Sequence, residues 1–192
     1  MVKTSMLTVL DSVLEKLPDL LVEKDQWQSL LIDYEHPHVE RIWRQVEENR
    51  LYLHVIHKCD PGLAFPHTHS WPSAMLIVAG QYDMKVGYEA STSLFAPPGT
   101  KGASFTSVKM HCPPGFRYEM TDPDSWHSVC PTTETVWTIM VTGKPWSKPG
   151  PKPTKQLNSL APEREKEIVL QFLDWWERWT KQTSVCGNTT LT

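Results

Sequence analysis

The stretch Gly62-Leu-Ala-Phe-Pro-His67-Thr-His69-Ser-Trp-Pro-Ser73-Ala-Met-Leu-Ile-Val-Ala-Gly80 places two histidines one residue apart, just before an apolar β-rich run. On a β-strand successive side chains alternate between faces, so His67 and His69 project to the same side and can share one ion. A third histidine, His127, lies in a later predicted strand, DSWHSVC. An antiparallel barrel can bring that strand beside the first pair. The pattern predicts a three-histidine metal site.

Short β-rich segments continue on both sides of this stretch. From about residue 39 the apolar residues alternate with a period of two, and the segments are separated by turns rich in Pro, Gly, Asp and Ser. A parallel sheet would need crossover helices between its strands, so the sequence predicts an antiparallel sandwich or barrel over residues 39–145. The expected strands are ERIWRQV, LYLHVIHK, AMLIVAG, QYDMKVGY, SFTSVKMHC, FRYEM, WHSVC and TVWTIMVTG.

Helices are expected at both ends of this barrel. Residues 1–38 should form an N-terminal helical extension, with a helix broken at Pro18 and a second short helix over residues 22–31. Residues 146–192 should hold a proline-rich connector, a helix over residues 162–181 and a polar tail. That last helix carries an apolar face that must dock on the barrel or on a second copy of the chain, and we expect a homodimer. The face comprises Ile168, Phe172, Trp175, Trp176 and Trp179.

Composition limits the class of protein. The 192 residues are 40% hydrophobic and 21% charged, which suits one folded domain over residues 1–192. A net charge of −3 gives no reason to expect nucleic acid or an anionic membrane as a partner. No apolar run approaches the roughly 20 residues of a membrane span, and Asp11 and Glu15 interrupt the segment where a signal peptide would be apolar. A soluble, cytoplasmic protein with reduced cysteines is expected.

The segment from His67 to Gly80 resembles the first motif of the cupin superfamily, GxxxxxHxHxxx(x)ExxxxxxG, whose second motif supplies another histidine from a later strand. The resemblance covers about residues 39–145. It implies a mainly β fold, an antiparallel double-stranded β-helix or jelly-roll barrel, with metal held by His67, His69 and His127. Two departures stand out: the first glycine is one residue nearer to the pair, and the motif glutamate falls on Ser73.

Losing that glutamate changes the chemistry. Three neutral imidazoles would hold one divalent ion whose charge the protein does not compensate, with positions left open for water, O2 or a small-molecule substrate. Similarity to three-histidine cupins that oxidise small thiols or cleave β-diketones implies an Fe(II) dioxygenase. The alternatives are an isomerase, lyase or hydrolase using Zn, Mn or Ni as a Lewis acid, and a non-enzymatic ligand-binding or sensory cupin. Glu119 or Asp124 could also supply a fourth, carboxylate ligand.

Other side chains are candidates for the pocket around the metal. Strand alternation places Trp71 and Ser73 on the face of the histidine pair, and Ser125 on the face of His127. A further group could hydrogen-bond a substrate or orient a ligand histidine: Tyr82, Lys85, Arg117 and Tyr118. Three other histidines have no partner at a matching spacing and are interpreted as core or surface residues: His54, His57 and His111.

Overall fold

Two antiparallel sheets form the framework of the computed structural model, which describes residues 5–88, 106–146 and 157–186. The six-stranded sheet has the order β1-β2-β3-β10-β5-β8 and the four-stranded sheet the order β4-β9-β6-β7. This is the predicted mainly β, jelly-roll fold. The strands are β1 (Gln28–Ile32), β2 (Val39–Val46), β3 (Asn49–His57), β4 (His67–Thr68), β5 (Ser73–Ala79), β6 (Tyr82–Tyr88), β7 (Thr106–Cys112), β8 (Arg117–Met120), β9 (Ser125–Pro131) and β10 (Thr135–Thr142).

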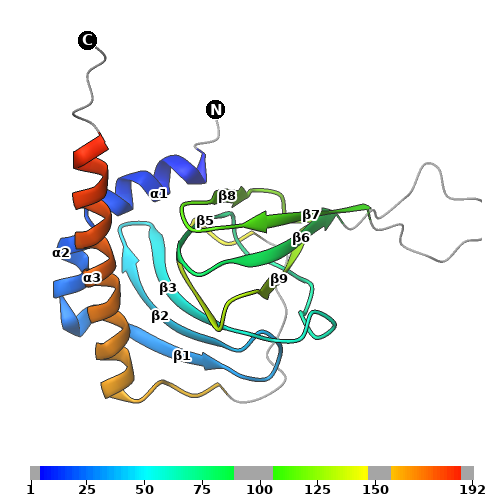
Figure 1. Ribbon diagram of the computed structural model, residues 1–192, viewed down its shortest axis with the longest axis horizontal. Helices are drawn as coiled ribbons and strands as arrows, with labels where there is room; N and C mark the ends of the chain where they lie inside the picture. Colours follow the sequence, from blue (N-terminus) through cyan, green and yellow to red (C-terminus); the bar gives the residue numbers. More distant parts are fainter. Residues whose placement is uncertain (1–4, 89–105, 147–156, 187–192) are drawn as a thin grey trace, which may run out of the picture.

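The six-stranded sheet separates two apolar layers because its side chains alternate between faces. On β10, Ile139 and Val141 join the cluster that also contains the helices, whereas Met140 packs with Tyr52 and Met75 inside the barrel. Figure 1 shows the helices gathered along one side of the molecule and β6, β7 and β9 on the other. Residues of one strand therefore either support the helices or line the interior.

Gly80 ends β5 with a φ of 69°, a left-handed conformation that favours glycine. A Cβ at this position would lie 2.2 Å from the carbonyl oxygen of Thr135, so no other residue fits without a backbone shift. The glycine of the sequence motif is thus required by the turn into β6.

The N-terminal segment differs from the expectation. Helix α1 (Met6–Glu15) is followed by α2 (Leu17–Val22), which has Pro18 in its first turn, where a missing N–H costs nothing. After a short 3-10 turn (Lys24–Gln26) the chain forms β1 and pairs with β2, Gln28 opposite Trp43. The helix expected over residues 22–31 is therefore wrong, because pairing with the edge of the sheet outweighs its weak helical spacing.

Helix α3 (Pro162–Cys186) begins where the sequence predicts and packs on the barrel of its own chain. Ile168 and Phe172 are fully buried, and the Phe172 ring lies 5.4 Å from that of Trp137 on β10. The predicted connector and tail fall largely on residues 147–156 and 187–192, outside the described residues. The homodimer stays a prediction. Within the described part of the chain, no helix is long and apolar enough to cross a membrane.

Candidate metal centre

Three histidines from two adjacent strands converge at one end of the four-stranded sheet. His67 opens β4, His69 follows that strand, and His127 lies on β9 directly opposite His67 in the antiparallel register. The Nε2 atom of His127 lies 3.0 Å from Nε2 of His69 and 3.1 Å from Nε2 of His67. The three potential ligand atoms all lie within 4.8 Å of one another. The barrel thus brings together the three residues that the sequence singled out.

Neighbouring groups orient two of these rings. The carbonyl oxygen of Phe65 lies 3.1 Å from Nδ1 of His67. A carbonyl can only accept, so the proton sits on Nδ1 and Nε2 keeps a free lone pair aimed at the cluster. On the other side, Nδ1 of His127 lies 3.5 Å from the Tyr118 hydroxyl, which in turn contacts the Tyr82 hydroxyl at 2.9 Å. Tyr82 therefore contacts Tyr118, which lies between it and His127.

The surroundings keep the three imidazoles neutral. Burial lowers the pKa of each, to about 3 for His69 and well below the ordinary value for His127. Mutual proximity adds to this, because His67 lowers the pKa of both His69 and His127. Neutral imidazole is the form that binds a metal ion.

The spacing fits a metal with open coordination positions. Two nitrogens each about 2.1 Å from one ion are about 3.0 Å apart at a right angle, and about 3.4 Å apart in a tetrahedron. The two separations that involve His127, 3.0 and 3.1 Å, are compatible with a right angle at an ion, and the three ligand atoms all lie within 4.8 Å of one another. Right angles belong to octahedral or related sites, in which three protein ligands leave several positions for small molecules.

The histidines line a cavity of about 310 Å³ between the two sheets. Its wall is mainly apolar and aromatic, with Arg41 as its cation and Glu35 as its carboxylate among the described lining residues. A concave wall of this kind, apolar with a few polar groups, is typical of sites for small molecules. Apolar and aromatic lining residues include Ile32, Val39, Ile56, Phe65, Trp71, Met75, Val129 and Met140. A larger depression, of about 1340 Å³, lies over the four-stranded sheet and reaches only His67 of the three histidines.

The predicted pocket residues divide into two groups. Trp71 lines the cavity, and its buried indole Nε1 has no hydrogen-bond partner among the described residues. Ser73 and Ser125 are buried but do not line it, contrary to the expectation. Ser73 opens β5, opposite Thr142 of β10, and the Ser125 hydroxyl donates to the carbonyl of Asp122.

Three charged candidates also lie elsewhere. Arg117 projects from β8 towards the helices and pairs with Asp11 of α1 at 2.5 Å. Glu119, on the same face of β8, accepts hydrogen bonds from the Ser5 hydroxyl at 2.7 Å and from a backbone N–H at the start of α1. Asp124 is exposed in the turn before β9. The proposed fourth carboxylate ligand is therefore not part of the cluster, and Arg117 does not reach the cavity.

Two cavity residues were not predicted as such: Arg41 belongs to no motif, and His54 was interpreted as a core or surface residue. Arg41 of β2 and His54 of β3 face each other in register, and Nε of Arg41 donates to Nε2 of His54 at 2.9 Å. The Thr138 hydroxyl lies 3.2 Å from the other ring nitrogen of His54. Burial and the nearby guanidinium hold the pKa of His54 well below its ordinary value. The alternating pattern of β2 and β3 was the available signal, but alternation does not show which face lines a cavity.

The cysteines stay apart from the histidine cluster. Cys59, Cys112 and Cys130 are free thiols, and burial raises the pKa of Cys59 and Cys112 to about 11. Thiols held protonated at neutral pH are poor nucleophiles and poor metal ligands.

No protein-family model matches the chain, and no curated protein matches it in sequence. Among solved structures it is similar to FeII HppE in complex with substrate, at 12% identity and a TM-score of 0.46, over 62% of this chain and 57% of that one. It is also similar to hydroxypropylphosphonic acid epoxidase from S. wedmorenis, at 12% identity and a TM-score of 0.42, over 60% and 55%. The chain thus matches little more than half the length of these proteins. Its sheet order is that of an antiparallel jelly roll, and its three-histidine cluster could hold a metal ion.

Proposed function

We propose that this protein is a metal-dependent cupin that holds one divalent ion on His67, His69 and His127 and acts as a non-haem Fe(II) oxygenase on a small organic substrate. The observation that carries the proposal is the convergence of three Nε2 atoms, two pairs of them at 3.0 and 3.1 Å. The proton of His67 sits on Nδ1, so its Nε2 lone pair is available to a divalent ion placed between the three rings.

The ligand set favours Fe(II) over a closed structural zinc site. The right-angle spacing leaves positions open, and three neutral ligands leave the charge of the ion uncompensated, which favours an anionic or chelating substrate. Bound iron would supply O2 activation. The chain would orient His67 through the Phe65 carbonyl, orient His127 through Tyr118, and exclude water with the apolar wall.

A second candidate is Lewis-acid chemistry with Zn, Mn or Ni, in an isomerase, lyase or hydrolase. One observation favours it: Glu35 lines the same cavity and is a candidate general base. A ligand-binding or sensory cupin would use the same cavity without turnover.

Metal analysis separates these functions first. Protein purified without added metal, and protein loaded anaerobically with Fe(II), should each be measured by mass spectrometry for metal per chain. Oxygen uptake is then followed with a panel of small thiols and β-diketones. One retained equivalent of iron and substrate-dependent oxygen uptake support the oxygenase. Retained Zn or Mn with no oxygen uptake favours Lewis-acid or binding roles, and failure to retain any divalent metal contradicts the proposal.

A further inference from the structure

Arg41 carries a positive charge inside the histidine cavity without a carboxylate partner among the described residues. Its Nε donates to His54, and its guanidinium carbon lies 5.2 Å from the centre of the Tyr52 ring. Neither contact neutralises the charge, because the imidazole is uncharged and the phenol is too. Four of the other five arginines have carboxylate partners, in the pairs Arg44–Glu23, Arg117–Asp11, Arg164–Glu40 and Arg178–Asp174, and the fifth, Arg50, is exposed and lies over the Trp43 ring.

The guanidinium is held in place with its outer edge free. Thr138, His54 and Arg41 form a chain of contacts at 3.2 and 2.9 Å that fixes the Nε side of the group. The two terminal nitrogens have no hydrogen-bond partner in the described part of the chain. An arginine does not lose its proton at physiological pH, so these nitrogens remain charged donors in a largely apolar cavity.

Desolvation has the largest effect on the pKa of Arg41. Burial lowers its pKa, and its charge in turn lowers the pKa of His54, His67 and His69. The guanidinium and the histidine cluster thus share one electrostatic environment. Arg41 is half-buried, and an unpaired charge against a largely apolar wall is unfavourable unless an ion of opposite sign arrives.

We propose that Arg41 anchors the substrate, and that the substrate is a small organic acid whose carboxylate pairs with the two terminal nitrogens of Arg41. Another donor atom of the same molecule would face the three histidines, and this part of the proposal rests on the proposed function. A planar guanidinium edge matches a carboxylate with two parallel hydrogen bonds. The cavity of about 310 Å³ has room for roughly ten waters, so the acid is small, and its body meets an apolar wall.

The charges of the cavity favour a monoanion at this end. Arg41 is its one cation among the described lining residues, and the Glu35 carboxylate lines the same space. A monocarboxylate matches the single charge of Arg41 itself, whereas the second charge of a phosphonate would have no cationic side chain beside Arg41 among the described lining residues. The carboxylate is therefore the chemistry that the anchor fits.

Calorimetric titration of metal-free protein tests the anchor without relying on the metal. The probes are butanoate, its neutral match butanamide, and butylphosphonate. Butanoate should bind at least tenfold more tightly than butanamide. Arg41→Met should weaken butanoate at least tenfold, and Arg41→Lys should recover only part of the loss. The control Arg50→Met removes an exposed arginine from neighbouring β3 and should leave the affinity unchanged.

Several outcomes overturn the proposal. Equal binding of butanoate and butanamide to the wild-type protein does so even if the Arg41 variants fail to fold. Undiminished butanoate binding by Arg41→Met, or tighter binding of butylphosphonate than of butanoate, also overturns it. Metal content is measured in parallel. Retained metal without butanoate binding rejects the anchor alone, whereas butanoate binding that depends on Arg41 in a protein that holds no metal rejects the proposed function alone.

Discussion

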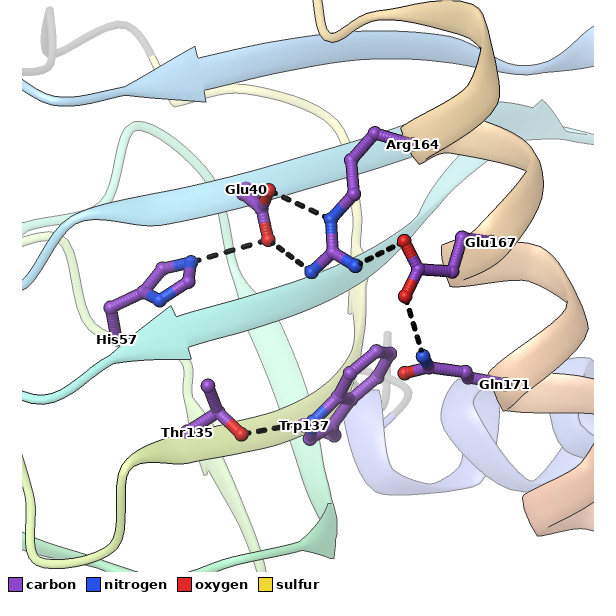
Figure 2. Close-up of polar contacts among 7 residues, drawn as sticks. All are labelled: Glu40, His57, Thr135, Trp137, Arg164, Glu167 and Gln171. Atoms are coloured by element: carbon purple, nitrogen blue, oxygen red, sulfur yellow. Dashed lines mark hydrogen bonds and ion pairs between the residues drawn. The ribbon is translucent and has the colours of Figure 1, made fainter.

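Arg164 of α3 binds both carboxylate oxygens of Glu40 on β2, with Nε 2.9 Å from Oε1 and a terminal nitrogen 2.6 Å from Oε2 (Figure 2). His57 contacts the same carboxylate at 3.2 Å, and Glu167 pairs with Arg164 at 2.7 Å. Because side chains alternate along β2, Glu40 faces the helix while its neighbour Arg41 faces the cavity. The docked helix therefore supports the strand that carries the proposed anchor.

Replacing Glu40 with glutamine should lower the free energy of unfolding by roughly 1–3 kcal/mol, the range for hydrogen bonds to charged groups. The pair is largely sheltered from water, with side-chain exposures of 28% for Arg164 and 14% for Glu40. Urea unfolding followed by tryptophan fluorescence gives the change. Glu134→Gln is the matched control, since Glu134 pairs with Lys58 but is 87% exposed, and it should change stability by no more than about 0.5 kcal/mol.

The contribution of Glu40 should also depend on pH. Its hydrogen bonds to Arg164 lower the pKa of the carboxyl, although burial opposes part of that shift. A carboxyl with a lowered folded-state pKa stabilises the fold above its unfolded-state pKa, and the stabilisation disappears as pH falls through the lower folded-state value. The stability difference between wild type and Glu40→Gln should be constant near neutral pH and shrink below about pH 4.5. A difference that stays unchanged down to pH 3 would contradict this assignment.

His127→Ala should reduce metal content sharply, because the two remaining imidazoles form an incomplete chelate. His127 contacts both other histidines, so its loss removes the centre of the cluster. His111→Ala removes a half-exposed histidine that pairs with Asp83, outside the cluster, and should leave metal content unchanged. One full equivalent of metal in the His127→Ala protein would contradict the assignment of His127 as a metal ligand.

Tyr118→Phe should weaken metal binding about tenfold, the lower end of the effect for residues that orient metal ligands. The lower end is expected because its hydroxyl lies 3.5 Å from His127, a long hydrogen bond. Competition with a coloured chelator measures the affinity. Tyr82→Phe, one contact further away, should have a smaller effect, and equal effects for the two variants would show that Tyr118 does not orient His127 directly.

The strands of the barrel were largely predictable because each strand and turn has its own local sequence pattern. The period-two segments and Pro-Gly turns placed the strands from β2 onward, and the same-face rule brought His67 and His69 together. Strand β1 could not be predicted this way, since Gln28–Ile32 forms a strand only because the edge of β2 is there to pair with it. Its short apolar run is equally compatible with a helix.

The cavity wall was less predictable than its metal ligands. Alternation correctly separates the two faces of β8, yet it does not reveal that Arg117 and Glu119 face α1 while Tyr118 faces the histidines. Arg41 belongs to no recognisable motif. Its proposed role as an anchor depends on β2 and β3 lining the same cavity as His67. Such relationships arise from the packing of segments far apart in the chain, which a single sequence does not specify.

Phe172→Ala should destabilise the protein by roughly 3–5 kcal/mol, because it removes a fully buried ring from the contact between α3 and the sheet. Leu170→Ala is the control on the opposite face of the helix, where the side chain is 53% exposed, and it should change stability by no more than about 0.5 kcal/mol. Sedimentation of both variants tests the expected homodimer. If α3 joins subunits through its outer face, Leu170→Ala will weaken the dimer while the melting temperature of the dissociated chain stays the same. If α3 serves only its own barrel, Leu170→Ala will leave the sedimentation profile unchanged, and Phe172→Ala will aggregate as the barrel face opens.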